Sequence, residues 1–346
     1  MYVQRMGQEL DHLIARWGGT SGRAAKGSAT RMETTATRRL TFSANLDFAH
    51  RQYISHCSTD LLLKYADALK EAHATRVDIN PGLWPWISHD QKNIEKYDAL
   101  VRHIRELGLQ IAWNPAYFQE DLRVGSLADW EKAALPVYSE MARRYKPDIF
   151  VLVHEPTTMH RRMGIEPSPE EWGQFVEKAI DVVKEASPQS HLAAGGVSWE
   201  LPYYNRFASI KGLDYLTIDV YFLKEIPTFV EMARTAHEHG KPVYIEETWR
   251  WAQAPARQAG TRLRDVSNQM YEPLDIKWLQ AMGLFAIRND ISAVTIFWST
   301  PFFTYLPSAV DASSPQFFNA VSEAIRTGKR TEYFRRFREM AQQYGN

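Results

Sequence analysis

The sequence has almost no cysteine and no net charge. Cys57 is the only cysteine among 346 residues, which excludes an intramolecular disulfide and a thiolate metal cluster and favours a reducing compartment such as the cytoplasm. Lys plus Arg and Asp plus Glu number 41 each. We therefore expect neither nucleic acid nor an anionic membrane surface as a partner.

Long apolar runs and nucleotide-binding motifs are missing as well. No stretch approaches the ~20 apolar residues of a membrane span, and residues 1–39 lack the apolar run of a signal peptide. No G-x-G-x-x-G or P-loop follows an apolar run, which argues against the usual nucleotide-binding folds. Residues 18–37 are rich in small and polar residues, so we expect 1–39 to form a flexible arm and 40–346 a single domain with a C-terminal helix.

What the sequence does contain is a regular alternation of short apolar runs and amphipathic helical stretches. Ser168 and Glu171 have the spacing of a helix start, and Gly108 and Gly240 stand where helices should end. Eight such units favour a closed (β/α)₈ barrel, an α/β fold, over an open doubly wound sheet. The strands are expected at Leu40–Leu46, Thr75–Ile79, Gln110–Trp113, Ile149–His154, His191–Val197, Tyr215–Tyr221, Val243–Glu247 and Ala293–Trp298.

Polar side chains follow most of these apolar runs, where a (β/α)₈ barrel carries its active site. Glu155 follows the fourth strand and the pair Glu246–Glu247 ends the seventh, nearly opposite across a barrel mouth. Two facing carboxyl groups are what retaining glycoside hydrolysis requires, one protonated and one ionised. The other polar or aromatic strand-end residues are Arg76, Asp78, Trp113, Asn114, His154, Asp219, Tyr221 and Trp298.

Two of these positions have more than one interpretation. Adjacent strand residues face opposite sides, so Glu247 should share a face with Val243 and Ile245, and Glu246 should face away from them. Alternation alone leaves either glutamate as the nucleophile. Arg76 is a candidate for keeping the nucleophile ionised, or else a structural partner of Asp78.

In these motifs the sequence resembles clan A of the retaining glycoside hydrolases, the barrel group of cellulase-, mannanase- and galactanase-like enzymes. The resemblance rests on His154-Glu155-Pro156, on the run from Pro242 to Glu247 and on Trp298 after an apolar strand, in that order. It implies that Glu155 is the acid/base and Glu247 the nucleophile, with a carbohydrate substrate and no metal or other cofactor. It also implies substrate-site roles for Trp298, Tyr221 and Arg76. From their positions at or after strand ends we expect the substrate site to include His154, Trp113, Asn114, Trp249 and Glu246 as well.

The sequence departs from the clan pattern at three strand ends. Position 154 is His where the clan usually has Asn, Asp219 stands where a His often precedes the strand-six Tyr, and Trp113-Asn114 replaces the usual strand-three His. Five tryptophans in expected loops could add sugar-binding platforms: Trp84, Trp86, Trp199, Trp249 and Trp251.

Two other functions fit the same residues. A metal-dependent sugar isomerase would use oxygen and imidazole ligands from several strand ends. A carbohydrate-binding barrel without turnover would keep only the aromatic platforms. The candidate metal ligands are Asp78, His154, Glu155, Asp219, Glu246 and Glu247.

Overall fold

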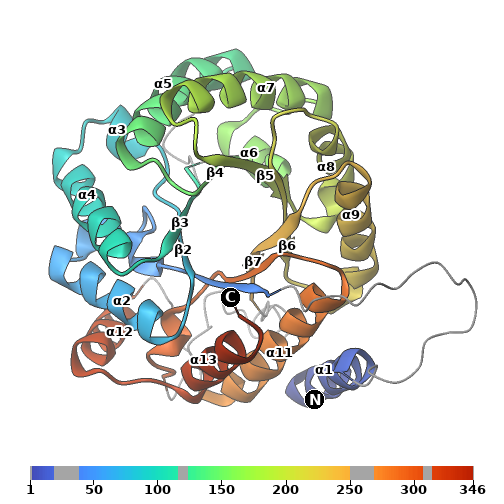
Figure 1. Cartoon of the computed structure of the whole chain (residues 1–346). Coiled ribbons are helices and arrows are strands. Elements are labelled where there is room, and N and C mark those ends of the chain that lie inside the picture. Colours follow the sequence, from blue (N-terminus) through green and yellow to red (C-terminus); the bar gives the residue numbers. More distant parts are fainter. Residues whose placement is uncertain (1, 19–38, 116–123, 250–268, 307–313, 346) are drawn as a thin grey trace, which may run out of the picture.

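The computed structural model describes residues 2–18, 39–115, 124–249, 269–306 and 314–345. Within them, eight parallel strands form a closed barrel in sequence order, with β8 paired to β1. The predicted (β/α)₈ barrel is therefore confirmed, and Figure 1 looks along its axis. The strands are β1 Thr41–Asn45, β2 Arg76–Ile79, β3 Gln110–Trp113, β4 Ile149–His154, β5 His191–Gly196, β6 Tyr215–Val220, β7 Val243–Thr248 and β8 Ala293–Ile296.

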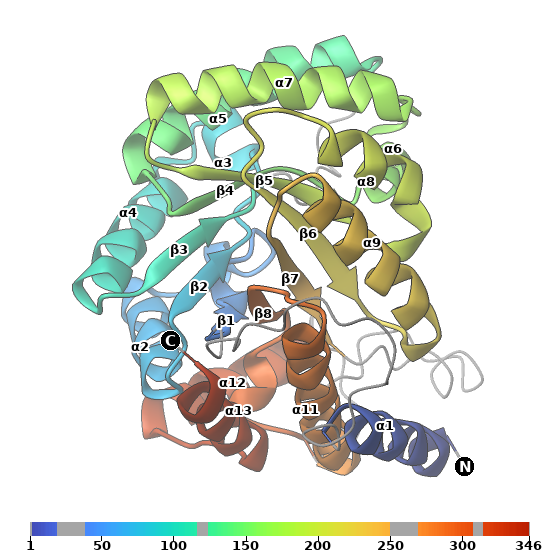
Figure 2. The ribbon, with the colours of Figure 1, turned by 45° about the vertical axis from the view of Figure 1, so that its right-hand side comes forward.

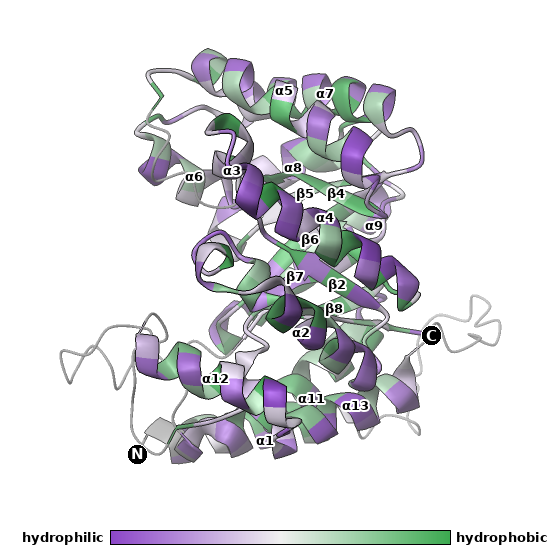
Figure 3. Ribbon diagram, turned by 90° about the vertical axis from the view of Figure 1, so that its left-hand side faces the viewer, coloured by the Kyte–Doolittle hydropathy of each residue, from purple (hydrophilic) through white to green (hydrophobic). Residues whose placement is uncertain are grey.

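Helices surround the barrel (Figure 2). Hydrophilic and hydrophobic residues alternate along these helices (Figure 3), because each helix buries one face. Ser168 and Glu171 form the predicted capping box of α7, and Gly108 and Gly240 have positive φ just after α4 and α9. The described helices are α1 Tyr2–Gly18, α2 Thr59–Glu71, α3 Trp84–Ile87, α4 Gln91–Glu106, α5 Leu127–Tyr145, α6 Pro156–Met163, α7 Pro169–Ala186, α8 Leu201–Ala208, α9 Ile226–Glu238, α11 Glu272–Arg288, α12 Pro315–Thr327 and α13 Glu332–Tyr344. None of these described helices is long and apolar enough to cross a bilayer.

Alternation along the strands divides side chains between the helices outside and the barrel interior. In β6, Leu216 and Ile218 join the large core shared with the helices, whereas Asp219 is buried among polar side chains. Ser43 of β1 also faces inward, where its hydroxyl donates to Asp78. One end of the interior is closed by a floor of apolar side chains, namely Ala112, Ile149, Val151, Ala193, Tyr244 and Ala293.

The expected flexible arm begins with a helix that the sequence analysis did not anticipate. Helix α1 packs against α11, beside which it lies in both Figures 1 and 2. Leu10 is fully buried, Trp17 meets Phe285 with ring centroids 5.7 Å apart, and Lys277 binds Asp11 across 2.6 Å. The apolar stripe of α1 needs this partner surface to be stable. Residues 19–38, the rest of the expected arm, lie outside the described residues.

Candidate active site

Glu155 follows β4 directly, in a backbone conformation that non-glycine residues rarely adopt. Its φ is 46° and its ψ is 68°, in the left-handed region, and its N–H donates to the carbonyl of Gly195 on β5 at 3.1 Å. Such strain persists where the surrounding structure enforces it, and it is concentrated at functional sites. The side chain is about one-tenth exposed, at the mouth of the barrel.

A β-bulge in β7 turns both Glu246 and Glu247 toward the barrel interior. Ile218 pairs with Ile245, but the next residue of β6, Asp219, pairs with Glu247, so Glu246 is the extra residue. The prediction that the two glutamates face opposite sides is therefore wrong, because the bulge interrupts the alternation between them. Both carboxyl groups contact the same side chain, His154.

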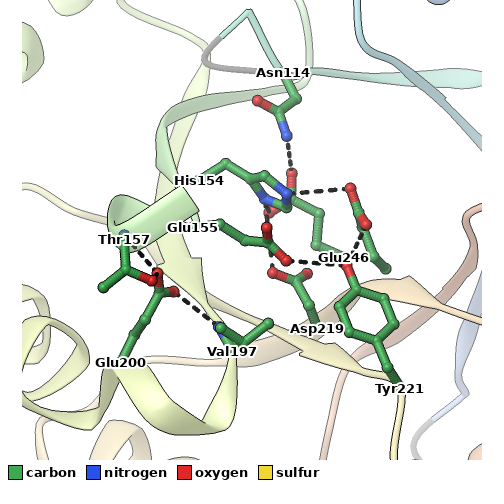
Figure 4. Close-up of polar contacts among 10 residues, drawn as sticks. Asn114, His154, Glu155, Thr157, Val197, Glu200, Asp219, Tyr221 and Glu246 are labelled. Atoms are coloured by element: carbon green, nitrogen blue, oxygen red, sulfur yellow. Dashed lines mark hydrogen bonds and ion pairs between the residues drawn. The ribbon is translucent and has the colours of Figure 1, made fainter. Parts of the chain in front are cut away.

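His154, the last residue of β4, is the centre of the polar cluster (Figure 4). Its Nδ1 lies 3.3 Å from Glu246 Oε2 and 3.8 Å from Asp219 Oδ2, and its Nε2 lies 3.1 Å from Glu247 Oε1. Burial disfavours the imidazolium, but the surrounding carboxylates outweigh burial and raise the pKa of His154 well above its ordinary value. The carboxylates around His154 thus favour its protonated, cationic form.

Glu155 and Glu247 approach each other closely. One carboxylate oxygen of each lies within 4.8 Å of the other, and the Tyr221 hydroxyl contacts both, at 3.1 Å from Glu155 Oε1 and closer still to Glu247 Oε2. Burial raises the pKa of Glu247 to about 7, although the His154 imidazolium and the Tyr221 hydrogen bond lower it. Glu247 can therefore lose or gain a proton near neutral pH.

Asn114 and Asp219 complete the cluster from β3 and β6. The Asn114 side-chain amide donates to Glu246 Oε1 at 2.6 Å. Asp219 is fully buried, and burial raises its pKa well above the ordinary value even though the His154 charge lowers it. Residues that the sequence placed at four strand ends thus meet at one point, as Figure 4 shows.

The same cluster has the donor chemistry of a cation site. Ligand atoms of His154, Asp219 and Glu246 lie within 4.8 Å of one another, as do those of His154, Glu155 and Glu247. One imidazole with several carboxylates suits a divalent transition metal. The same contacts also pair an imidazolium with carboxylates.

Two of the expected aromatic platforms, Trp249 and Trp298, lie next to each other, and Trp249 also lies next to Tyr221. The Trp249 ring is 5.9 Å from that of Tyr221 and 6.5 Å from that of Trp298, nearly perpendicular to the latter, and both indoles are half-buried. Trp84 and Trp199 are exposed. By contrast, Trp86 is buried against other aromatic rings and cannot be a platform, and Trp251 lies outside the described residues.

The predicted substrate-binding role of Trp113 is wrong. Alternation points Trp113 away from the barrel interior, and it is fully buried, with its ring stacked on Tyr145 at 4.5 Å and its indole N–H donating to Met141 Sδ. The neighbouring Asn114 is the residue that reaches the site.

Arg76 also lies away from the predicted position. It is the first residue of β2, deeper in the barrel, where it binds Asp78 at 3.3 Å, donates to Thr295 and covers the Tyr244 ring at 4.5 Å. Its structural interpretation, as a partner of Asp78, is the one that these contacts support. The charge beside Glu247 is supplied by His154 instead.

Glu200 is a buried carboxylate near the site that the sequence analysis did not select. Its side chain is 1% exposed and accepts hydrogen bonds from Thr157, two residues after Glu155, and from the backbone of Val197. Burial and the nearby Glu155 raise the pKa of Glu200 to about 7. A Glu before Leu201-Pro202 reads in the sequence as an ordinary acidic helix start, so no pattern distinguished it.

Comparison with known proteins finds similarity in structure alone. No protein-family model and no curated protein sequence matches this chain. A GH5_18 protein from Bifidobacterium longum, in complex with Manβ1-4GlcNAc, is 14% identical over 88% of this chain and 78% of its own, with a TM-score of 0.62.

Two β-mannoside-cleaving enzymes are also similar in structure. An exo-β-1,4-mannosidase from an Opitutaceae bacterium is 11% identical over 93% of this chain and 62% of its own, with a TM-score of 0.62. An endo-1,4-β-D-mannanase from Thermotoga petrophila is 11% identical over 84% and 99%, with a TM-score of 0.53. These likenesses show that the chain shares the (β/α)₈ barrel fold of these three proteins.

Proposed function

We propose that this protein is a retaining β-glycoside hydrolase in which Glu247 is the nucleophile and Glu155 the acid/base. The observation that carries the proposal is the approach of the two carboxyl groups, which have oxygens within 4.8 Å and share the Tyr221 hydroxyl. Retaining enzymes hold their carboxyl groups ~5–5.5 Å apart, whereas inverting enzymes leave ~6.5–9.5 Å for a water molecule.

The two glutamates divide the reaction between them. Glu155 donates a proton to the glycosidic oxygen as its bond to the anomeric carbon breaks, while a Glu247 oxygen bonds to that carbon from the opposite face. Water then attacks the anomeric carbon and gives a proton to Glu155 as the bond between that carbon and the Glu247 oxygen breaks. Both groups are restored, and a sugar of unchanged configuration is released. His154 and Tyr221 favour ionised Glu247 by ion pairing and hydrogen bonding.

The remaining site residues are proposed to bind the sugar. The half-buried indoles of Trp298 and Trp249 offer faces for stacking on the apolar side of a pyranose ring. Asn114 and Glu246 offer polar atoms to its hydroxyl groups. Similar structures include β-mannanases, a β-mannosidase and complexes with Manβ1-4GlcNAc, so β-mannosides are the first substrates to test.

The stereochemistry of hydrolysis tests the proposal. We expect turnover of at least one member of a panel of aryl β-mannosides, glucosides, galactosides and xylosides, with the β-anomer of the sugar appearing first in ¹H NMR spectra. If the α-anomer appears first, the mechanism is inverting and Glu247 is not a nucleophile. Sugar binding by calorimetry without any turnover would instead identify a carbohydrate-binding barrel.

The His154, Asp219 and Glu246 cluster supports one alternative, a metal-dependent sugar isomerase. Dialysis against EDTA separates the two functions, because the two-glutamate mechanism needs no metal. Aryl glycoside hydrolysis that survives EDTA supports the hydrolase. Aldose–ketose interconversion that is lost on chelation and restored by Mn²⁺ or Co²⁺ would support the isomerase.

The activity is expected to fall as the pH is lowered through about 7, because burial raises the pKa of the Glu247 carboxyl to that value. Attack requires the ionised form, which is present above this pKa and lost below it. An ordinary glutamate, of pKa ~4.3, would keep its charge across this range. The acidic limb of kcat/KM, measured with the fastest aryl glycoside, is the readout.

Replacing Tyr221 with Phe tests whether Glu247 causes this pH dependence, and replacing Tyr244 with Phe is the control. The Tyr221 hydrogen bond lowers the pKa of Glu247, so Y221F should move the acidic limb to higher pH. Tyr244 is a matched tyrosine in the barrel interior whose hydroxyl makes no hydrogen bond within the described part of the chain, and Y244F should leave the limb in place. Equal shifts in both variants would contradict this assignment.

A further inference from the structure

Helix α6 begins immediately after Glu155, and its first turn is capped by a residue from elsewhere in the chain. Glu155 occupies the N-cap position, where Ser, Thr, Asp and Asn side chains accept a backbone N–H, and its own longer side chain makes no such bond. The Thr157 N–H donates instead to Glu200 Oε1 at 2.6 Å, and the Thr157 hydroxyl donates to the same oxygen at 2.6 Å. Figure 4 shows Glu200 beside Thr157, with dashed lines for these contacts.

The second oxygen of Glu200 ties this turn to the end of β5. Glu200 Oε2 accepts the Val197 N–H at 3.0 Å, so the carboxylate joins the β4–α6 turn to the β5–α8 loop. Gly196 leaves room for this arrangement, because a Cβ there would lie 2.0 Å from Glu200 Oε2 and 3.2 Å from the Cα of Glu155. The backbone of Glu155 is thus packed directly against the segment that Glu200 fixes.

Capping of α6 by Glu200 leaves the Glu155 side chain out of the cap. A carboxylate engaged in capping α6 would be turned toward the helix and away from the barrel mouth. In the structure Glu200 takes up the Thr157 N–H, while the Glu155 carboxyl points into the site and accepts a hydrogen bond from the Tyr221 hydroxyl at 3.1 Å. Glu200 accepts three donors and is almost fully buried, so its geometry is closely defined.

We propose that Glu200 is a positioning residue for the acid/base: by capping α6 in place of Glu155, it holds the Glu155 carboxyl over the glycosidic oxygen. This inference rests on the proposed hydrolase function. A purely structural Glu200 would stabilise the loops without affecting proton transfer, and the two roles predict different dependences on the leaving group.

Leaving-group dependence is the test, because 2,4-dinitrophenolate departs without a proton and phenolate needs one from Glu155. The probes are the 2,4-dinitrophenyl and phenyl glycosides of the sugar that the wild type hydrolyses fastest. We expect E200A to lower kcat/KM for the phenyl glycoside by up to about 10²-fold, the usual cost of a misplaced catalytic group. The dinitrophenyl glycoside should retain its kcat/KM within a few-fold.

Two further variants grade the effect. T157V removes one of the three hydrogen bonds and should give a smaller loss of the same kind. E200Q keeps one carbonyl for Thr157 but turns an amide N–H₂ toward the Val197 N–H, and should lie between T157V and E200A. The control is D214N. Asp214 directly precedes β6, at the other end of the barrel, and its carboxylate accepts the Leu192 N–H at 2.8 Å. D214N should show no leaving-group dependence.

The benchmark E155A separates failure of this inference from failure of the proposed function. If E155A itself shows no leaving-group dependence, Glu155 is not the acid and the proposed function fails. If E155A shows a leaving-group dependence but folded E200A lowers kcat/KM equally for both glycosides, Glu200 is structural and the inference is overturned. Crystal structures give a readout independent of activity: in E200A the Glu155 carboxyl should leave Tyr221, and its retention there would overturn the inference.

Discussion

Replacing Glu247 with Ala is expected to lower kcat for aryl glycoside hydrolysis by at least about 10⁴-fold, as loss of a covalent nucleophile does in other enzymes. No neighbouring group replaces it, because Glu246 is held by Asn114 at 2.6 Å and Glu155 must carry the proton. Steady-state kinetics measure the loss, with circular dichroism to verify that the variant is folded. The matched variant E246Q should lose less, since a glutamine oxygen can still accept the Asn114 amide.

Trapping identifies the nucleophile among the two adjacent glutamates. A 2-deoxy-2-fluoro glycosyl fluoride forms a long-lived glycosyl-enzyme, because the C2 fluorine slows both its formation and its hydrolysis while the fluoride leaving group at the anomeric carbon speeds only its formation. Tandem mass spectrometry of the labelled peptide should place the sugar on Glu247, which contacts Tyr221 and lies within 4.8 Å of Glu155. A label on Glu246 would reverse the assignment, and absence of a label from an active enzyme would exclude a covalent intermediate.

The sequence predicted one of these two glutamates as the nucleophile, but not that both face the barrel interior. The motif running from Pro242 favoured Glu247, and the Tyr221 contact supports that choice. Strict alternation, however, would have sent Glu246 and Glu247 to opposite faces, and only the bulge between β6 and β7 brings both to His154. A bulge depends on the pairing of two distant strands, so a single-sequence pattern does not reveal it.

Most of the barrel was predictable because most strands form short apolar runs and the helices between them form amphipathic stretches. Two predicted site residues lie elsewhere: Trp113 points out of the barrel, and Arg76 lies deeper inside it. Alternation from Ala112, which the structure places on the barrel floor, puts Trp113 outside and Asn114 inside, but an alanine in an apolar run does not reveal in the sequence which face it takes. The depth of Arg76 depends on where β2 begins, which strand patterns define only within a few residues.

Glu200 and helix α1 were missed for another reason. Each depends on a partner far away in the sequence, Thr157 for Glu200 and α11 for α1. A carboxylate that caps a helix from another loop has no fixed spacing from it, unlike the Ser168–Glu171 box, whose spacing is set by one helical turn. Local patterns therefore predict elements well and contacts between loops poorly.

Replacing Glu155 with Ala should reduce kcat/KM about 10²–10⁴-fold for substrates with poor leaving groups, the usual contribution of a general acid. A substrate whose leaving group departs without a proton should keep most of its kcat/KM, because kcat/KM reports the steps up to formation of the glycosyl-enzyme. Its kcat should still fall, because the second step lacks the base that activates water. The measurement is a pair of Michaelis–Menten curves, with phenyl and 2,4-dinitrophenyl glycosides.

Azide distinguishes a lost base from a damaged site. It is an anion that attacks the anomeric carbon without giving up a proton, so it should restore the kcat of E155A on the dinitrophenyl glycoside. The carboxyl it replaces lies on the leaving-group side, opposite Glu247, so the product should be the β-glycosyl azide. E247A offers the contrast: azide there would take the place of the nucleophile and give the α-azide. A β-azide from E247A, or no rescue of E155A, would mean that the two glutamates do not have these separate roles.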